Sequence, residues 1–129
     1  MTHTILFVDD EENVLESMKR EFHPEPYSLR FALSGPKALD VLRKDAVSVI
    51  VSDMRMPMMD GVTFLQKAKK AQPNAVRIIL SAHADMQTVL RAIESGDIWR
   101  FLVKPWEHGD LLETVRKAVA HHESLVSGQ

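Results

Sequence analysis

The sequence predicts an α/β domain in which helices cover both faces of a parallel sheet. Short apolar segments alternate strictly with segments of helical periodicity, which favours strand–helix units joined by right-handed crossovers. Residues 47–52 form an almost unbroken apolar run, which is typical of a strand buried on both faces. At 129 residues the chain has the length of one ordinary domain. The pattern fits either doubly wound strand order equally well.

The first half of the chain supplies three of the expected strands, at residues 4–8, 27–33 and 47–52. The first strand is a short apolar run, and the second alternates apolar with polar residues. Between them, apolar residues at helical spacing predict a helix that Pro24 and Pro26 end. Ser34 is a favourable N-cap for the next helix, and Pro36 suits its first turn.

The second half continues the alternation, with strands expected at residues 76–80 and 98–103. A third helix should follow Gly61 and end before Pro73, and a fourth should end at Gly96. The last helix is expected from about residue 109 to residue 122. We expect one domain over residues 1–122, with residues 123–129 as a helix end that runs into a linker.

Composition and charge exclude several classes of protein. Sixteen basic and eighteen acidic residues give a formal net charge of −2, so nothing suggests a nucleic-acid-binding surface. No apolar run approaches the roughly 20 residues that span a bilayer, and residues 1–10 lack the basic region of a signal peptide. The absence of cysteine excludes disulfides and thiolate chemistry. We expect a cytoplasmic domain without membrane or direct nucleic-acid contacts.

Side chains capable of chemistry follow four of the expected strands. They are Asp9 and Asp10, then Asp53, Ser81 and Lys104. The carboxyl ends of parallel strands lie at one edge of a sheet, so these groups should converge. Taken singly, each has an ordinary interpretation as a helix cap, a turn residue or a solvated surface charge. Their joint occurrence predicts a functional site instead.

The chemistry of these groups indicates phosphoryl transfer. Three neighbouring carboxylates repel one another unless a cation lies between them, and an all-oxygen site suits Mg²⁺. The Lys104 ammonium adds a second positive charge for an anionic guest. Carboxylates, Mg²⁺ and lysine together suit phosphoryl transfer, because its catalysis is mostly positioning and charge neutralisation. One carboxylate would then be the nucleophile, as in enzymes that form an aspartyl phosphate.

Four motifs resemble the receiver domain of two-component response regulators. They are ILFVDDEENV, VIVSDMRMPMMDG, IILSAHAD and RFLVKPW, and the resemblance covers residues 4–122. It implies a flavodoxin-like, doubly wound parallel sheet with strand order 2-1-3-4-5, an order for which this family is a standard example. It also implies a domain that catalyses its own phosphorylation and dephosphorylation, rather than an enzyme acting on other substrates.

The resemblance assigns the phosphoacceptor and its metal site. Asp53 would accept a phosphoryl group from a sensor histidine kinase, a phosphotransfer protein or a small phosphodonor. Asp10, Asp53 and the backbone carbonyl of Arg55 would bind Mg²⁺ directly, with Asp9 acting through water. Arg55 is a departure, because many members carry another polar residue at this position, which influences phosphoryl lifetime.

The resemblance also assigns the groups that respond to the phosphate. Lys104 would pair with a phosphoryl oxygen, and Ser81 would donate a hydrogen bond to another. Phe101 matches the switch aromatic, although it lacks the hydroxyl of the commoner tyrosine. The Lys104–Pro105 peptide bond is expected to be cis.

The output surface implied by the resemblance comprises the fourth helix, fifth strand and fifth helix. Four residues are expected to be exposed there: Arg91, Glu94, Trp99 and Arg100. This surface would control an output domain in the same or another chain, and it could also form a homodimer. The run RFLVKPWE resembles receivers joined to hydrogenase-type transcriptional activators or to cyclic-dinucleotide phosphodiesterase domains.

Two other functions stay open at this point. One is a Mg²⁺-dependent phosphatase with an aspartyl-phosphate intermediate, although Arg55 occupies the position of its usual acid/base aspartate. The other is a degenerate receiver that only mediates protein contacts, against which the intact acid set argues. Weaker signals are a methionine cluster, which either packs under the loop or contacts a kinase, and scattered histidines. These residues are Met54, Met56, Met58, Met59, His83, His121 and His122.

Overall fold

A sheet of five parallel strands forms the centre of the protein, whose computed structural model describes residues 2–128. The strands are β1 (His3–Val8), β2 (Tyr27–Ala32), β3 (Val49–Asp53), β4 (Val76–Ser81) and β5 (Arg100–Val103). Their order across the sheet is β2-β1-β3-β4-β5. The predicted parallel sheet is therefore confirmed, as is the strand order that the resemblance implied.

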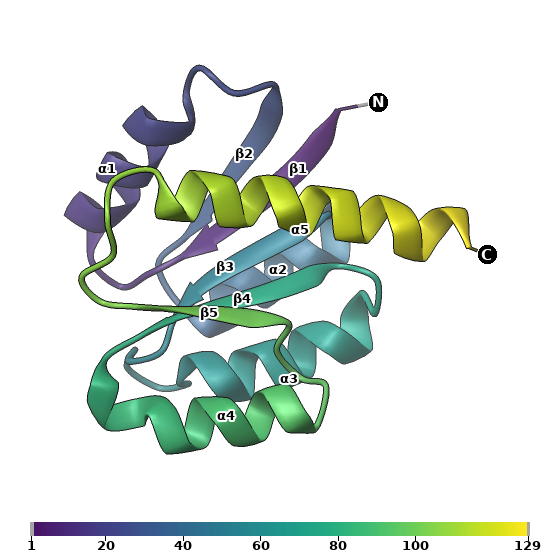
Figure 1. Cartoon of the computed structure of the whole chain (residues 1–129). Helices are drawn as coiled ribbons and strands as arrows, with labels where there is room; N and C mark the ends of the chain where they lie inside the picture. Colours follow the sequence, from purple (N-terminus) through teal and green to yellow (C-terminus); the bar gives the residue numbers. More distant parts are fainter. Residues whose placement is uncertain (1, 129) are drawn as a thin grey trace.

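A helix follows every strand. The helices are α1 (Glu12–Phe22), α2 (Gly35–Lys44), α3 (Gly61–Ala71), α4 (Met86–Glu94) and α5 (Asp110–Ser127), with a short 3₁₀ turn, η1 (His83–Asp85), before α4. Figure 1 shows α5 crossing one face of the sheet while α3 and α4 lie against the other. Both termini lie at the end of the sheet opposite the carboxyl ends of the strands (Figure 1).

Alternate residues of each central strand pack into two separate cores. On β1, Leu6 and Val8 face the core formed with α2, α3 and α4, whereas Ile5 and Phe7 face the core formed with α1 and α5. This alternation follows from the two-residue period of a strand. Each large apolar side chain that becomes fully buried contributes roughly 1.5–3 kcal/mol. The strands that carry the site are thus held rigidly from both faces.

Every residue of β3 is buried, from Val49 to Asp53. Its residues pair with β1 on one side and β4 on the other, so that Val51 lies between Phe7 and Ile78. The central position explains why the sequence of this strand is apolar without alternation. It also fixes Asp53 at the edge of a rigid support.

Some element boundaries differ from those predicted. β5 begins at Arg100 rather than at residue 98, because the Ile98 N–H donates to the Ala92 carbonyl at the end of α4. β3 begins at Val49 rather than at residue 47, and the Val47 N–H is bonded by the side chain of Gln72. α5 continues to Ser127, beyond the predicted end at residue 122, since no helix-breaking residue precedes Gly128.

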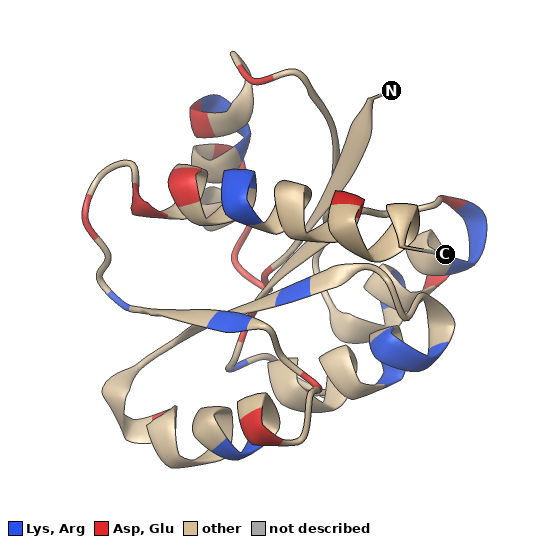
Figure 2. Cartoon of the chain, turned by 45° about the vertical axis from the view of Figure 1, so that its right-hand side comes forward, with Lys and Arg blue, Asp and Glu red and all other residues tan. Residues whose placement is uncertain are grey.

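Charges of both signs are spread over the helices in the view of Figure 2, in keeping with the nearly balanced composition. None of the helices in residues 2–128 combines the length and apolarity needed to cross a bilayer.

Candidate functional site

The carboxyl edge of the sheet gathers the side chains that the sequence singled out. Asp9 and Asp10 follow β1, Asp53 is the last residue of β3, Ser81 is the last of β4, and Lys104 follows β5. Because all the strands are parallel, their carboxyl ends lie side by side at this edge. The predicted convergence of these positions is confirmed.

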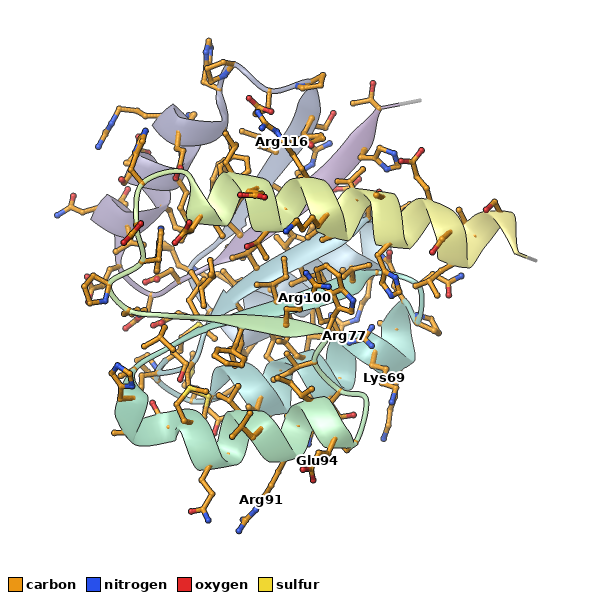
Figure 3. The ribbon with its side chains drawn as sticks, in the orientation of Figure 1. Lys69, Arg77, Arg91, Glu94, Arg100 and Arg116 are labelled. Carbon is orange, nitrogen blue, oxygen red and sulfur yellow. The ribbon has the colours of Figure 1, made fainter. Side chains whose placement is uncertain are left out.

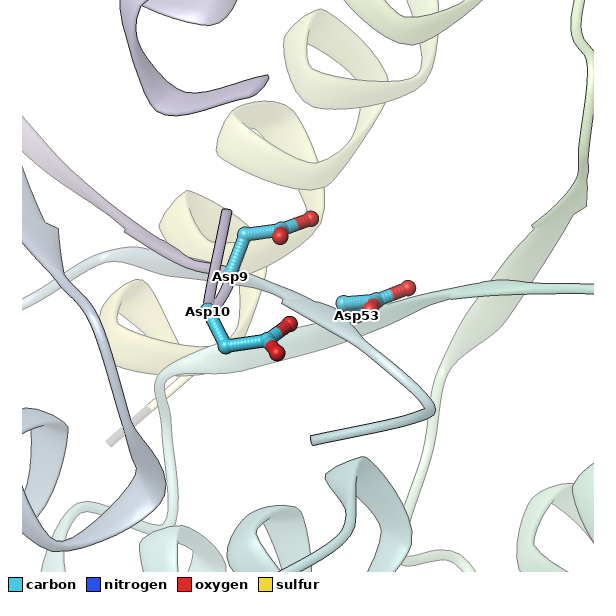
Figure 4. Close-up of side chains that lie close together, drawn as sticks. All are labelled: Asp9, Asp10 and Asp53. Atoms are coloured by element: carbon cyan, nitrogen blue, oxygen red, sulfur yellow. The ribbon is translucent and has the colours of Figure 1, made fainter. Parts of the chain in front are cut away.

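Three carboxylates form the centre of this edge. Asp9, Asp10 and Asp53 each offer an oxygen atom, and these oxygens all lie within 4.8 Å of one another. Figure 4 shows the three side chains extending in the same direction from the ends of their strands. Asp9 is 2% exposed and Asp53 is 6% exposed, whereas Asp10 is open to solvent. The cluster is therefore anchored in the core and accessible from one side.

The pKa of Asp9 is raised to about 6, chiefly by burial, and the charges of Asp53 and Asp10 contribute to the rise. The Glu11 N–H, which donates to Asp9 Oδ1 at 2.9 Å, and the charge of Lys104 oppose that rise. A cation bound between these carboxylates would offset the burial and the repulsion that raise the pKa of Asp9. Their oxygen chemistry and mutual distances fit a hard divalent ion such as Mg²⁺.

Lys104 supplies the positive charge at this edge. Its Nζ donates a hydrogen bond to Oδ1 of Asp53, and its backbone N–H donates to the Ser81 carbonyl at 2.9 Å. The Lys104–Pro105 peptide bond is cis. The lysine thus reaches from the end of β5 to the end of β3, where an anion bonded to Asp53 would meet it.

The Ser81 hydroxyl is bonded to the backbone rather than to the carboxylates. It is fully buried and donates to the carbonyl oxygen of Ala82 at 2.9 Å. Phe101 is half-buried and packs against the core under α4. In this state neither side chain contacts the acidic cluster, so a contact between Ser81 and a phosphate requires the hydroxyl to turn.

Close packing fixes the loop after β3 beneath Asp53. The Gly61 N–H donates to the Met54 carbonyl at 2.8 Å, and the Asp60 side chain caps α3 by accepting from the Thr63 N–H at 2.8 Å. A Cβ atom on Gly61 would lie only 2.3 Å from the Asp53 carbonyl oxygen. Glycine is therefore required for the chain to pass so close to the site.

The methionines of this loop divide between packing and exposure. Met54 is buried, and Met56 and Met59 pack partly against the core, which favours the packing interpretation for these three. Met58 is instead 84% exposed and has a φ of 71°, in the left-handed region that is costly for a non-glycine residue.

The side chain of Arg55 makes a contact that the sequence did not predict. Its Nε donates to Oδ2 of Asp85 at 3.1 Å and its Nη2 donates to Oδ1 at 2.6 Å. Asp85 lies in the quoted motif IILSAHAD, but its pairing joins two loops and depends on the tertiary fold. The burial of Asp85 is visible only in the structure, so the sequence carried no specific signal for this pair.

The three histidines singled out in the sequence do not meet. His83 is exposed in η1, His121 stacks on Trp99 with ring centroids 5.2 Å apart, and His122 bonds the Asn74 carbonyl. Within residues 2–128, the carboxylates Asp9, Asp10 and Asp53 form the one group of three or more candidate ligands that lie close together.

The expected output surface is exposed in part. Arg91, Glu94 and Arg100 are exposed, and Figure 3 shows Arg91 and Glu94 extending from α4 away from the sheet. Trp99 was expected to be exposed, but it is half-buried. Its ring contacts the His121 ring and the guanidinium of Arg100, whose carbon is 4.2 Å from the Trp99 ring centroid.

Comparison with known families agrees with this geometry. The model of the response regulator receiver domain matches residues 5–116. The chain belongs to this family. Receiver domains are signalling domains that bind Mg²⁺ at an acidic pocket, and this chain carries an acidic cluster of Asp9, Asp10 and Asp53.

The alignments with individual relatives cover nearly the whole receiver domain. The hydrogenase transcriptional regulatory protein HoxA of Cupriavidus necator is 34% identical over 116 residues, which are 90% of this chain and 24% of HoxA. The chain thus spans about a quarter of the length of the HoxA relatives that it matches.

Two crystal structures are very similar to this receiver domain. One, described as adenylate cyclase from Rhodopirellula baltica, is 33% identical with a TM-score of 0.96, over 99% of this chain and 95% of that chain. The other, the signal receiver domain of an HD domain-containing protein from Pseudomonas fluorescens Pf-5, is 34% identical with a TM-score of 0.90. That match covers 98% of this chain and 93% of that chain.

Proposed function

We propose that this receiver domain accepts a phosphoryl group on Asp53 from a sensor histidine kinase or a phosphotransfer protein. The observation that carries the proposal is the position of Asp53, which lies between the carboxylates of Asp9 and Asp10 and the ammonium of Lys104. Asp53 ends a strand buried at every position, so its carboxylate is presented from a rigid support. Rigid positioning and opposite charges are what phosphoryl transfer requires.

The acid cluster fits Mg²⁺ by its ligand chemistry and by the mutual repulsion of its carboxylates. We assign Asp10, Asp53 and the backbone carbonyl of Arg55 as direct ligands and Asp9 as a ligand through water. When bound, the ion neutralises charge on the transferring phosphoryl oxygens.

The residues of the chain supply the remaining chemistry. A carboxylate oxygen of Asp53 forms a bond to phosphorus while the bond from phosphorus to the donor's imidazole nitrogen breaks. The imidazole leaves with the electron pair of that bond. Lys104, already paired with Asp53, stabilises the negative charge on a phosphoryl oxygen.

Phosphorylation would then act on the face formed by α4, β5 and α5. The new group adds roughly −1.5 to −2 charges and three acceptor oxygens. The Ser81 hydroxyl, now bonded to the Ala82 carbonyl, would turn to donate to one of these oxygens, and Phe101 would move inward behind it. This change would control an output domain in the same or another chain, a transcriptional activator or a cyclic-dinucleotide phosphodiesterase.

The two alternative functions, a Mg²⁺-dependent phosphatase and a degenerate receiver, have less support. The Arg55 side chain, which stands where a phosphatase would need an acid/base, is engaged by Asp85. A degenerate receiver would not need an intact set of three carboxylates and a lysine.

Incubation with Mg²⁺ and acetyl phosphate tests the proposal by intact mass. We expect one added phosphoryl group in the wild type and none in Asp53→Asn, while the control Asp60→Asn behaves as the wild type. An unmodified wild type would favour the degenerate receiver. Repeated turnover on unrelated phosphate esters would favour the phosphatase.

A further inference from the structure

The ion pair between Arg55 and Asp85 connects the two loops that border the phosphorylation site. Arg55 follows Asp53 by two positions, and Asp85 follows Ser81 by four. The guanidinium contacts both oxygens of the carboxylate, at 3.1 and 2.6 Å. This bidentate geometry is the strongest form of an arginine–carboxylate contact. It ties the loop after β3 to the loop after β4.

The side chains of Arg55 and Asp85 differ greatly in solvent exposure. Asp85 is 7% exposed, whereas the side chain of Arg55 is 75% exposed. Within residues 2–128, Arg55 is the one side chain that donates to the Asp85 carboxylate. A buried carboxylate without a partner is costly, so this contact restrains the loop that carries Asp85. The guanidinium, in contrast, can turn toward another anion through solvent.

Asp85 also stands at the N-cap of α4, but its side chain caps none of the N–H groups there. Aspartate is favoured at this position because its carboxylate accepts from the free N–H groups of the first turn. Here Arg55 occupies the carboxylate instead. Asp85 therefore has an alternative partner within its own helix if Arg55 leaves.

A phosphoryl group on Asp53 would offer Arg55 a second and more highly charged partner. The hydrogen bond and charge of Asp85 are the main causes that raise the pKa of Arg55, followed by the charge of Asp60. A phosphoryl group on Asp53 would carry up to two negative charges and three acceptor oxygens, two positions away in sequence. Guanidinium binds phosphate oxygens with the same fork that it offers to a carboxylate.

We propose that Arg55 exchanges Asp85 for the phosphoryl group when Asp53 is phosphorylated. Asp85 then turns to cap α4, and the loop after β4 is released. In this account Asp85 is a positioning residue that holds Arg55, and with it α4, in the unphosphorylated arrangement. The inference rests on the proposed phosphorylation of Asp53 and adds a second link from the phosphate to α4, separate from Ser81 and Phe101.

Binding of beryllofluoride with Mg²⁺, which mimics the phosphoryl group, tests the exchange through Trp fluorescence. Asp85→Asn removes the negative charge while keeping the shape and the capping ability of the side chain. We expect this variant to bind beryllofluoride roughly fivefold tighter or more, because Arg55 no longer has to leave a carboxylate. Adding Arg55→Gln to Asp85→Asn should weaken binding again by roughly fivefold or more.

Arg116, on α5 (Figure 3), provides the matched control, because Arg116→Gln removes another arginine–carboxylate pair, the one with Glu25. Its affinity should equal that of the wild type. Equal affinities of wild type and Asp85→Asn, or no effect of Arg55→Gln in the Asp85→Asn background, would overturn the exchange. A wild type that does not bind beryllofluoride at all would overturn the proposed function together with the exchange.

The wild-type protein offers a second readout that needs no substitution at the ion pair. The Nε–H signal of Arg55 in a ¹⁵N–¹H spectrum should move when beryllofluoride binds, and the backbone signals of the first turn of α4 should move with it. Asp53→Asn should show neither change. An Arg55 signal that stays in place while the wild type binds the mimic would overturn the exchange and leave the proposed function standing.

Discussion

Lys104 donates a hydrogen bond to Asp53 across the intervening strand β4. This bond connects the end of β5 to the end of β3. The contact places a positive charge where the phosphate is proposed to form. It also links the site to β5, the strand that belongs to the expected output surface.

Replacing Lys104 with Met should slow phosphorylation without unfolding the protein. Removal of one preorganised charge donor at a reacting group costs roughly 10²–10³ in rate. The initial rate of modification by acetyl phosphate, measured by intact mass, checks this expectation. Lys67→Met changes an exposed lysine on α3 and should leave the rate unchanged. A normal rate in Lys104→Met would remove Lys104 from the proposed chemistry.

Magnesium should stabilise the folded protein through the carboxylate cluster. An ion that binds only the folded state adds roughly 2.7 kcal/mol at a hundred times its Kd. The midpoint temperature of thermal unfolding should therefore rise with added Mg²⁺ in the wild type and fall back to its metal-free value on chelation. Asp10→Asn should lose most of this shift while unfolding at a similar or higher temperature without metal, because repulsion within the cluster is relieved. An undiminished Mg²⁺ shift in Asp10→Asn would contradict the assigned ligand set.

Ser81→Ala should uncouple phosphorylation from the conformational response. The hydroxyl donates only to the Ala82 carbonyl in this state, so its loss should change stability by about 1 kcal/mol or less. Phosphorylation of Asp53 should continue, but the beryllofluoride-induced shifts of backbone NMR signals in α4 and β5 should shrink. Full shifts in Ser81→Ala would show that the response does not pass through this hydroxyl.

Gly61→Ala should destabilise the protein strongly, because the added Cβ would meet the Asp53 carbonyl at 2.3 Å. The contact atom belongs to the rigid backbone of β3, so we expect a loss of about 3 kcal/mol in the free energy of unfolding. Gly109→Ala is the matched control. Gly109 has a φ of 89° with no atom within 4 Å of an added Cβ, and its substitution should cost about 1 kcal/mol. Urea denaturation separates these values, and equal losses would contradict the close-approach argument.

Met58→Gly should stabilise the protein, because glycine adopts the observed φ of 71° without steric cost. The gain should be roughly 0.5–1 kcal/mol, since relief of left-handed strain exceeds the entropy that glycine adds to the unfolded chain. Ala82→Gly, at an exposed residue with a φ of −81°, should instead lose stability in the same urea titration. A loss in Met58→Gly would mean that the exposed side chain itself stabilises the loop.

The sequence alone predicts the layers of this fold, because alternation between strand and helix periods leaves few architectures. Residue patterns could not decide the strand order, which came from the resemblance to receiver domains. The convergence of Asp9, Asp53 and Lys104 follows from the rule that ends of parallel strands share an edge. Each of these residues is fixed by its own strand, which is why its place was predictable.

The features that the sequence did not predict depend on contacts between distant segments. Asp85 gains its role from Arg55, which lies 30 residues earlier in the chain. Ile98 was expected in a strand, but its N–H bonds the end of α4. The positive φ of Met58 is set by the closure of its loop rather than by the local preference of methionine. These contacts and backbone conformations are determined by tertiary structure, which outweighs local propensity.

Locating the phosphoryl group by chemical trapping tests the central claim most directly. Borohydride reduces an acyl phosphate of aspartate to a homoserine side chain, which peptide mass spectrometry can place in the sequence. After treatment with Mg²⁺ and acetyl phosphate, we predict reduction at Asp53 alone. Reduction at Asp9, Asp10 or Asp60, or no reduction of a protein that carries added phosphate, would contradict the assignment of Asp53 as the phosphoacceptor.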